Sequence, residues 1–259
     1  MKQSIVAYST PHNAGKPAWK AWWILWLSMI FILSSLLFFN ARLDTYIWCA
    51  TRWAVGDEQY YSWKSFHAEH LKDVNPPFYM IWEPPMGSQF YARSEWLWFA
   101  FKAGGEAWMS AAVLGGVALF HRRRIMAAAG LASVAIPGIA GELMRIVDGR
   151  FRPTHHDGAT TWVWFRGFYN GTDLSFPSGH ATAAFALAAV LGYLFPRGRP
   201  LFLLLATLTA ISRVVQEAHF WSDVLCGATL GWSGAWLTMQ ALDRFLSRRA
   251  VIGGTSLSK

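Results

Sequence analysis

Long stretches without charge alternate with polar segments along this chain. The first stretch is Ala21–Phe39 and the last is Val224–Leu242, each nineteen residues long. A helix needs about 20 apolar residues to cross a hydrocarbon core of about 30 Å. Both stretches therefore predict membrane-spanning helices.

Four further apolar stretches lie between these two. They are a second span within Trp96–Phe120, a third over about Ile125–Met144, a fourth over Pro177–Phe195 and a fifth over Leu201–Glu217. We therefore predict an all-α fold, a polytopic membrane helix bundle with six transmembrane helices. In the second span, Lys102 and Glu106 are spaced i,i+4, so they can pair on one helix face, with a proton relay as the alternative.

Two polar segments, Asn40–Arg93 and Arg145–Phe176, interrupt the apolar pattern. The first is rich in aromatic residues that favour the membrane interface, so we expect short interfacial helices in this first outer loop. The chain then divides into an N-terminal tail (1–20), a membrane domain (21–246, with outer segment 40–93 and active-site part 145–223) and a C-terminal tail (247–259). The start of the N-terminal tail is too polar, and the apolar run after it too long, for a cleaved signal peptide.

The composition agrees with a membrane protein. Charged residues make up 15% of the chain, against about 25% in soluble domains. This excludes disorder and argues against a cytosolic enzyme. The net charge of +8 could indicate nucleic acid, but the positive residues lie at the ends of apolar runs, where they indicate topology. The two cysteines form neither a disulfide framework nor a metal-binding motif.

Six spans place both termini on one side of the membrane. The segments on that side contain twelve Lys and Arg residues and those on the opposite side contain nine. Because cytoplasmic segments are richer in Lys and Arg, we predict that both termini are cytoplasmic and that the two long polar segments face outward.

Polar residues gather near the predicted outer ends of the spans, in four separate parts of the sequence. They are Arg145 and Arg152 after the third span, Ser178, Gly179 and His180 at the start of the fourth, Arg213 near the end of the fifth, and His219 and Asp223 before the sixth. The six-span topology places all four groups on one face of the membrane. A cationic residue within an apolar run, such as Arg213, is a candidate functional residue.

These residue types suit phosphoryl transfer. Guanidinium groups match phosphate oxygens with two donors, and the free N–H groups at a helix start, here Ser178 and Gly179, hold anions. His219 and Asp223 are spaced i,i+4, so on a helix the carboxylate can fix the imidazole tautomer and leave the other nitrogen as a nucleophile. His180 is a second imidazole that can protonate a leaving alkoxide.

The three motifs together resemble the signature of the type 2 phosphatidic acid phosphatase (PAP2) family. They read Arg145-x6-Arg152-Pro153, Pro177-Ser178-Gly179-His180 and Ser212-Arg213-x5-His219-x3-Asp223. The family usually has Lys at the first position, where this chain has Arg145, so the contact geometry there is open.

The resemblance implies a catalytic mechanism without metal or other cofactor. His219 would attack phosphorus and form a phosphohistidine, Asp223 would orient His219, and His180 would protonate the leaving oxygen and then assist water. The phosphoryl oxygens would be held by Arg145, Arg152, Ser178, Gly179 and Arg213.

We therefore expect a lipid phosphate or diphosphate phosphatase at the outer face of a bacterial inner membrane. Lipid A, phosphatidylglycerophosphate, prenyl diphosphate and phosphatidic acid are candidate substrates, and we expect no nucleic acid partner. The alternatives are a lipid phosphotransferase, a non-enzymatic lipid-phosphate binding or transport protein, and a vanadate-dependent haloperoxidase, which the apolar spans disfavour. The sequence leaves the headgroup and the oligomeric state open.

Two further features have more than one interpretation. His155, His156 and Asp157 are either a metal site or, as we favour, a solvated loop. The aromatic run Trp162–Phe165 either contacts the lipid chain of a substrate or anchors the loop at the interface.

Overall fold

The computed structural model describes residues 19–54, 90–120, 124–155, 161–169 and 173–255. Within these ranges the fold is all-helical, as predicted, with two isolated β-bridges in the segment after the third predicted span. The α-helices are α1 (Trp19–Phe39), α2 (Ala41–Ala54), α4 (Phe90–Ala103), α5 (Ala107–Phe120), α6 (Arg124–Asp148), α7 (Gly179–Leu194), α8 (Arg199–Val215) and α9 (Trp221–Thr255). Short 3₁₀ turns are η2 (Pro153–His155), η3 (Arg166–Phe168) and η4 (Pro196–Gly198).

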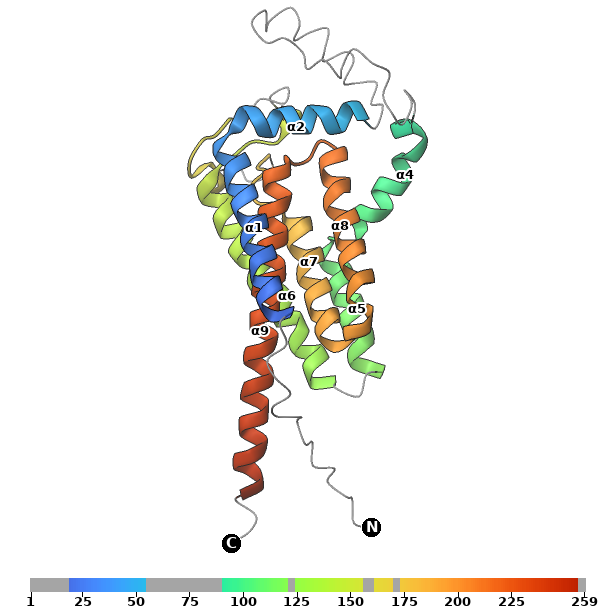
Figure 1. The fold of residues 1–259 in the computed structure, drawn as a ribbon, viewed down its shortest axis with the longest axis vertical. Coiled ribbons are helices and arrows are strands. Elements are labelled where there is room, and N and C mark those ends of the chain that lie inside the picture. The colour runs from blue at the N-terminus through green and yellow to red at the C-terminus, as the bar shows by residue number, and fades with distance from the viewer. Residues whose placement is uncertain (1–18, 55–89, 121–123, 156–160, 170–172, 256–259) are drawn as a thin grey trace, which may run out of the picture.

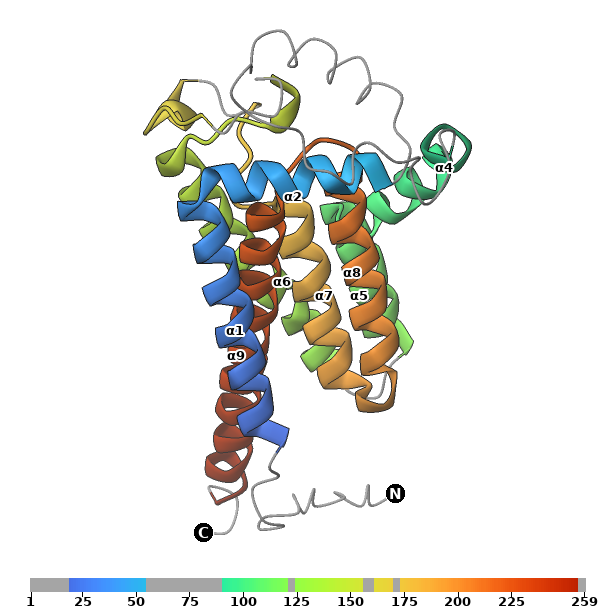
Figure 2. The ribbon, with the colours of Figure 1, turned by 45° about the horizontal axis from the view of Figure 1, so that its top comes forward.

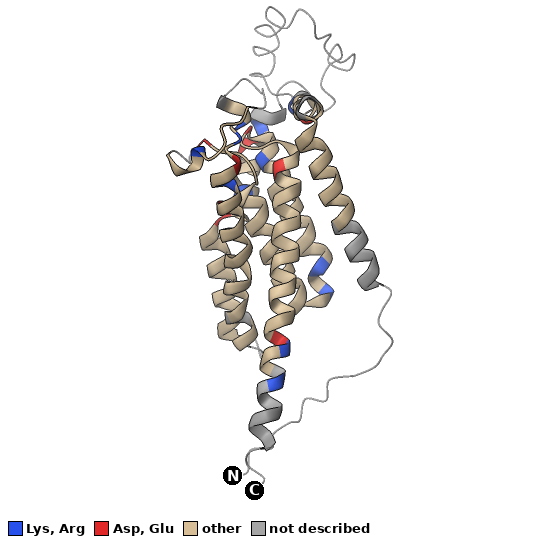
Figure 3. Cartoon of the chain, turned by 90° about the vertical axis from the view of Figure 1, so that its left-hand side faces the viewer, with Lys and Arg blue, Asp and Glu red and all other residues tan. Residues whose placement is uncertain are grey.

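Helix α7 lies at the centre of the bundle, among α5, α6, α8 and α9 (Figures 1 and 2). Helix α1 packs on α9, and α2 turns by 101° from α1 and crosses one end of the bundle. The beginning of α1 and the end of α9 lie at the opposite end (Figure 1). Charged residues gather mainly where α2 crosses, with a smaller group at the other end and uncharged helix between (Figure 3).

Several helices can cross a membrane. Ala129–Asp148 in α6 and Pro196–Val215 in η4 and α8 are long and apolar enough, and the bent pairs α1–α2 and α4–α5 raise this number from two to four within the described residues. Their outer faces carry exposed aliphatic side chains, such as Leu36, Ile139 and Leu204. Because such faces suit a lipid environment, the chain is an integral membrane protein.

One prediction was wrong. The second span is not one helix, because α4 ends at Ala103 and α5 begins at Ala107 after a bend of 57°. Two consecutive glycines, Gly104 and Gly105, explain the break, since glycine disfavours the helix interior. The C-terminal helix α9 includes the whole predicted sixth span, Val224–Leu242, and continues to Thr255.

The predicted outer segment is described only in part. Helix α2 lies within this segment and crosses the end of the bundle (Figure 2), and its position at the membrane interface stays a prediction. Residues 55–89, with most of the aromatic residues that motivated this expectation, lie outside the described residues.

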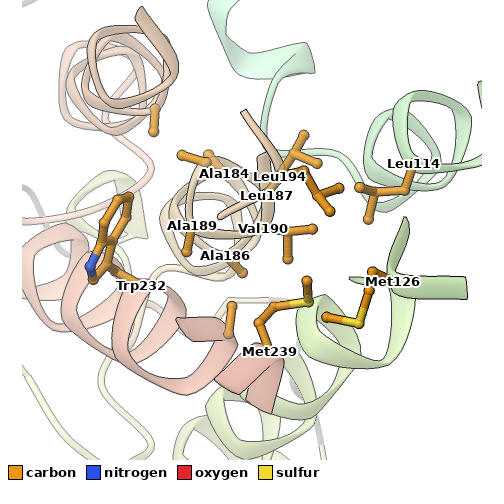
Figure 4. Packing of buried hydrophobic residues seen from close by; sticks show 13 residues of the cluster. Leu114, Met126, Ala184, Ala186, Leu187, Ala189, Val190, Leu194, Trp232 and Met239 are labelled. Carbon is orange, nitrogen blue, oxygen red and sulfur yellow. The ribbon is translucent and has the colours of Figure 1, made fainter. Parts of the chain in front are cut away.

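The core surrounds α7. Leu187, Val190 and Leu194 on this helix pack with Leu114 of α5 and Met239 of α9 (Figure 4). The opposite face of α7 carries small residues, which allow α9 to approach it closely.

Two glycines of α9, Gly227 and Gly231, make this approach possible. A Cβ atom at Gly231 would lie 2.1 Å from the backbone oxygen of Thr182, and one at Gly227 would lie 2.5 Å from that of Ser178. Small residues at such positions allow membrane helices to pack at short distance. The first turns of α7 and α9 are therefore held side by side.

We expect Gly231→Ala to destabilise the protein by about 1–3 kcal/mol, because the added methyl group forces α7 and α9 apart. The measurement is the midpoint of thermal unfolding in detergent. Gly115→Ala in α5 is the matched control, since no atom lies within 4 Å of a Cβ there and alanine favours the helix. Equal midpoints for the two variants would contradict the close packing.

Candidate active site

The N-terminal ends of α7 and α9 meet at the end of the bundle that α2 crosses. Ser178 caps α7 with its side chain, which accepts a hydrogen bond from the Ala181 N–H at 3.4 Å. The Ser178 N–H donates to the backbone oxygen of Asp223 at 3.0 Å. The prediction of a free N–H group at Ser178 was therefore wrong, because the start of α9 already accepts this hydrogen bond. Gly179 is the first residue of α7, where a helix leaves its backbone N–H groups free to bind an anion.

Gly179 lies directly under a guanidinium group. A Cβ atom at this position would lie 2.8 Å from Nη2 of Arg145, which donates to the Pro177 carbonyl at 3.0 Å. The other terminal nitrogen of Arg145 donates to Glu142 at 2.9 Å. Arg145 therefore reaches from the last turn of α6 to the first turn of α7.

The other two predicted arginines lie near the same place. Arg152 donates from Nε to the Leu174 carbonyl at 3.3 Å, and its pKa is lowered, first by burial and then by the positive charge of Arg145. Arg213 is buried, donates to Gln216, and interacts electrostatically with Arg152. Like charges gathered in this way make the site attractive to an anion.

His219 lies beside Asp223, but not on the helix that its spacing predicts. It precedes α9 in the loop after α8, and its Nδ1 lies 3.6 Å from Oδ2 of Asp223. Asp223 instead reaches back over the helix start, where the same oxygen accepts the Phe220 N–H at 2.8 Å. Burial lowers the pKa of His219 to about 4, so the ring is neutral at neutral pH.

His180 has an acidic partner that the sequence analysis assigned differently. Its Nε2 lies 3.2 Å from Oε1 of Glu106, in the break between α4 and α5. The predicted pair of Lys102 and Glu106 is present at 3.7 Å, but across this break and not on one helix face. Gly105 makes the contact possible, because a Cβ atom there would lie 2.7 Å from the His180 backbone oxygen.

Electrostatic interactions connect the two histidines through one arginine. Arg213 interacts with His180 and with His219, and Arg152 also interacts with His219. All eight predicted site residues therefore lie around the starts of α7 and α9, where they come from four parts of the sequence.

Sequence reasoning missed a buried ion network behind Asp223. Arg150 donates to Oδ1 of Asp223 at 2.7 Å and to Oδ2 of Asp44 at 2.9 Å, and all three side chains have no exposed surface. Ser175 also donates to Asp223, and Ser222 donates to Asp44. The positions of Asp44 and Arg150 in the two polar segments were visible in the sequence. Nothing in the sequence pattern indicated that these two residues form an ion pair.

Aromatic rings enclose this network. The Arg150 guanidinium lies 4.2 Å from the ring centre of Phe220, 5.3 Å from Trp162 and 5.5 Å from Phe38. Trp162, which is partly buried, therefore packs against the Arg150 guanidinium. The rest of the aromatic run, Val163 to Phe165, is exposed.

No group of three or more His, Cys, Asp or Glu side chains that could hold a metal ion occurs among the described residues. The possible metal site at His155 cannot be followed further, because His156 and Asp157 lie outside the described residues.

Comparison with known proteins adds independent information. Residues 125–246, which include all eight predicted site residues, match the PAP2 superfamily. A lipid A 1-phosphatase of Rhizobium johnstonii is 37% identical over 109 residues, which are 41% of this chain and 43% of that protein. A decaprenylphosphoryl-5-phosphoribose phosphatase of Mycobacterium tuberculosis is 36% identical over 124 residues, which are 48% of this chain and 65% of that protein.

The matches to these curated relatives thus span from less than half to about two thirds of their length. Among solved structures, a transmembrane PAP2 type phosphatidylglycerolphosphate phosphatase from Bacillus subtilis aligns with 79% of this chain and 94% of its own. The TM-score is 0.43 and the sequence identity is 18%.

We expect Arg150→Met to destabilise the protein by about 3–5 kcal/mol, because it leaves two buried carboxylates without their cation. The double variant Arg150→Met/Asp44→Asn should recover part of this loss, since one of the buried charges is then removed. Thermal unfolding in detergent measures both effects.

Arg145→Met is the matched control for the Arg150 variant. Its main acidic partner, Glu142, is 58% exposed, so the loss of this pair should change stability by less than about 1 kcal/mol. If the Arg150 and Arg145 variants unfold at the same temperature, the buried network does not hold this end of the bundle together.

Proposed function

Because residues 125–246 of this chain match the PAP2 superfamily, we propose that the protein is an integral membrane phosphatase that hydrolyses the phosphate group of a lipid. The observation that carries the proposal is the meeting of two histidines and three arginines around the starts of α7 and α9.

Binding of the phosphate is the first step. The guanidinium groups of Arg145, Arg152 and Arg213 neutralise its charge, and the backbone N–H group of Gly179 at the start of α7 receives one of its oxygens. A phosphate monoester carries about −1.5 to −2 charge at neutral pH, which matches a site with an excess of cations. The same donors stabilise the charge that moves onto these oxygens in the transition state.

Transfer of the phosphoryl group to the protein is the second step. Nδ1 of His219 faces Asp223, so Nε2 is the nitrogen available for attack, and the neutral ring has the lone pair that this requires. The N–P bond forms as the P–O bond to the lipid breaks. His180 gives its proton to the leaving oxygen, and the adjacent Glu106 carboxylate stabilises the protonated His180 ring before this transfer.

Hydrolysis of the phosphohistidine completes the cycle. His180, now neutral, takes a proton from water as the water oxygen attacks phosphorus. The N–P bond breaks, inorganic phosphate leaves, and His219 returns to its neutral form. No step in this scheme uses a metal ion.

For the lipid part of the substrate, we propose a chemical class and no single compound. The two relatives described above are named as phosphatases of lipid A and of decaprenylphosphoryl-5-phosphoribose, so both names give a lipid phosphate as the substrate. We propose a substrate of this class, with lipid A, a prenyl phosphate or diphosphate, phosphatidic acid and phosphatidylglycerophosphate as the compounds to test.

Among these compounds, the wild-type protein should hydrolyse at least one, and His219→Ala should abolish phosphate release from that substrate. EDTA should leave wild-type turnover unchanged. The assay measures inorganic phosphate in detergent with no added lipid acceptor. Tyr193→Phe, at the distant end of α7, should retain full activity and shows that detergent handling is not the cause of a loss.

Three results would contradict this function. Loss of wild-type activity in EDTA would indicate a metal-dependent enzyme. Unchanged turnover of His219→Ala would remove the nucleophile. Phosphate that moves only to an added lipid acceptor, and never to water, would indicate a phosphotransferase.

We also propose a six-span topology in the inner membrane of a bacterium, with the candidate site on the periplasmic side and both termini in the cytoplasm. The spans would be α1, the bent pair α4–α5, α6, α7, α8 and α9. Support comes from the excess of Lys and Arg on the side of the termini and from the position of the site at the end opposite the beginning of α1.

Cysteine labelling tests this orientation. Thr154 in η2 and Arg248 in α9 are exposed positions for a cysteine substitution, while the native Cys49 and Cys226 are buried. We expect a membrane-impermeant maleimide to label Thr154→Cys in intact spheroplasts and Arg248→Cys only after permeabilisation. The reverse pattern would invert the topology, and labelling of both or neither in intact cells would contradict the six-span arrangement.

A further inference from the structure

A cavity of about 310 Å³ lies among α4, α5, α7 and α8, below the candidate active site. Its lining is almost entirely apolar, and the α7 and α8 walls include small residues, Ala184, Ala188 and Ala206. At about 30 Å³ for each water molecule in the liquid, this volume is equivalent to roughly ten waters. The cavity is therefore large enough for part of a hydrocarbon chain.

The cavity follows the same helix faces as the site residues. On α7, Ala184, Ala188 and Leu191 of the lining lie four, eight and eleven residues after His180, which places them on one face of the helix. At 1.5 Å per residue, this stripe extends about 16 Å from His180 towards the middle of the bundle.

The neighbouring helices repeat this arrangement. On α8, Thr209 and Leu205 lie four and eight residues before Arg213. On α5, Met109 and Val113 follow Glu106 at three and seven residues. The stripes on α7 and α8 thus have His180 and Arg213 at their active-site ends, and the stripe on α5 has Glu106 just before the helix begins.

The few polar atoms in the lining already have partners. The Thr209 hydroxyl donates to the Phe101 carbonyl at 2.9 Å. The cavity therefore offers shape and apolar surface, with no side-chain donor left over for a headgroup. A headgroup belongs at the charged end, beside His180, Arg213 and Glu106.

We propose that this cavity binds the first part of one hydrocarbon chain of the substrate and so places the phosphorus atom at His219. The proposal rests on the proposed lipid phosphatase function. Lipid tails in the bilayer are as apolar as the cavity, so burial of the chain contributes little affinity of its own. The benefit is orientation, because a reacting phosphate held in one position reacts faster than a mobile one.

Filling the cavity tests the proposal. Ala188→Phe and Ala206→Phe each place a ring in it from opposite walls, and Ala132→Phe, on the exposed face of α6, is the matched control. The substrates are dipalmitoyl and dihexanoyl phosphatidic acid, or the long-chain and short-chain forms of whichever lipid phosphate the wild-type protein hydrolyses, in the same detergent.

We expect each cavity variant to lower kcat/KM for the long-chain substrate by about tenfold or more and to keep kcat/KM for the short-chain substrate within about twofold of wild type. Activity on the short-chain substrate shows that the variant is folded. The Ala132→Phe control should match wild type on both substrates.

Equal losses on the two substrates, or no loss on either, would overturn the cavity as a chain-binding site. These outcomes differ from a failure of the proposed function, in which the wild-type protein releases no phosphate from any lipid phosphate. A second measurement uses the wild-type protein alone. Its kcat/KM should rise with chain length until the cavity is filled, and no dependence on chain length would also overturn the proposal.

Discussion

The buried carboxylate of Asp223 is the interaction on which this end of the molecule depends. One of its oxygens accepts from Arg150, and the other accepts from the Phe220 N–H and lies beside His219. Through Arg150 it is linked to Asp44 of α2. Three distant segments are thus held by one charge cluster, and removal of Arg150 would leave two buried carboxylates without compensation. The residue proposed to orient the nucleophile therefore also fixes α2 across the bundle.

Sequence patterns predicted a large part of this arrangement. The apolar stretches predicted the all-helical fold, and the start of α7 at Gly179 follows from the Pro-Ser-Gly-His motif. The spacing of the three motifs predicted which residues would meet. These features depend on local preference and on periodicity, which a single sequence records directly.

Other features depend on contacts between distant segments, and no local pattern encodes them. Arg150 and Asp44 are separated by 106 residues, so each was interpreted only as a charge in a polar segment. Glu106 was assigned to its neighbour Lys102, although the glycine pair beside it brings it to His180. The i,i+4 spacing of His219 and Asp223 correctly predicted that the two side chains lie close together. The predicted reason, a shared helix face, was wrong, because His219 precedes the helix.

The length of α9 sets the depth of the chemistry in the membrane. Asp223 in its first turn and Asp243 further along enclose nineteen residues without a charge. At 1.5 Å per residue, the two carboxylates are about 30 Å apart along the helix axis, which is the thickness of a hydrocarbon core. When Asp243 lies at one water–lipid boundary, Asp223 and His219 lie at the other. A phosphate group bound at the candidate site would then stay in the headgroup layer, and the lipid that carries it would not have to leave the bilayer.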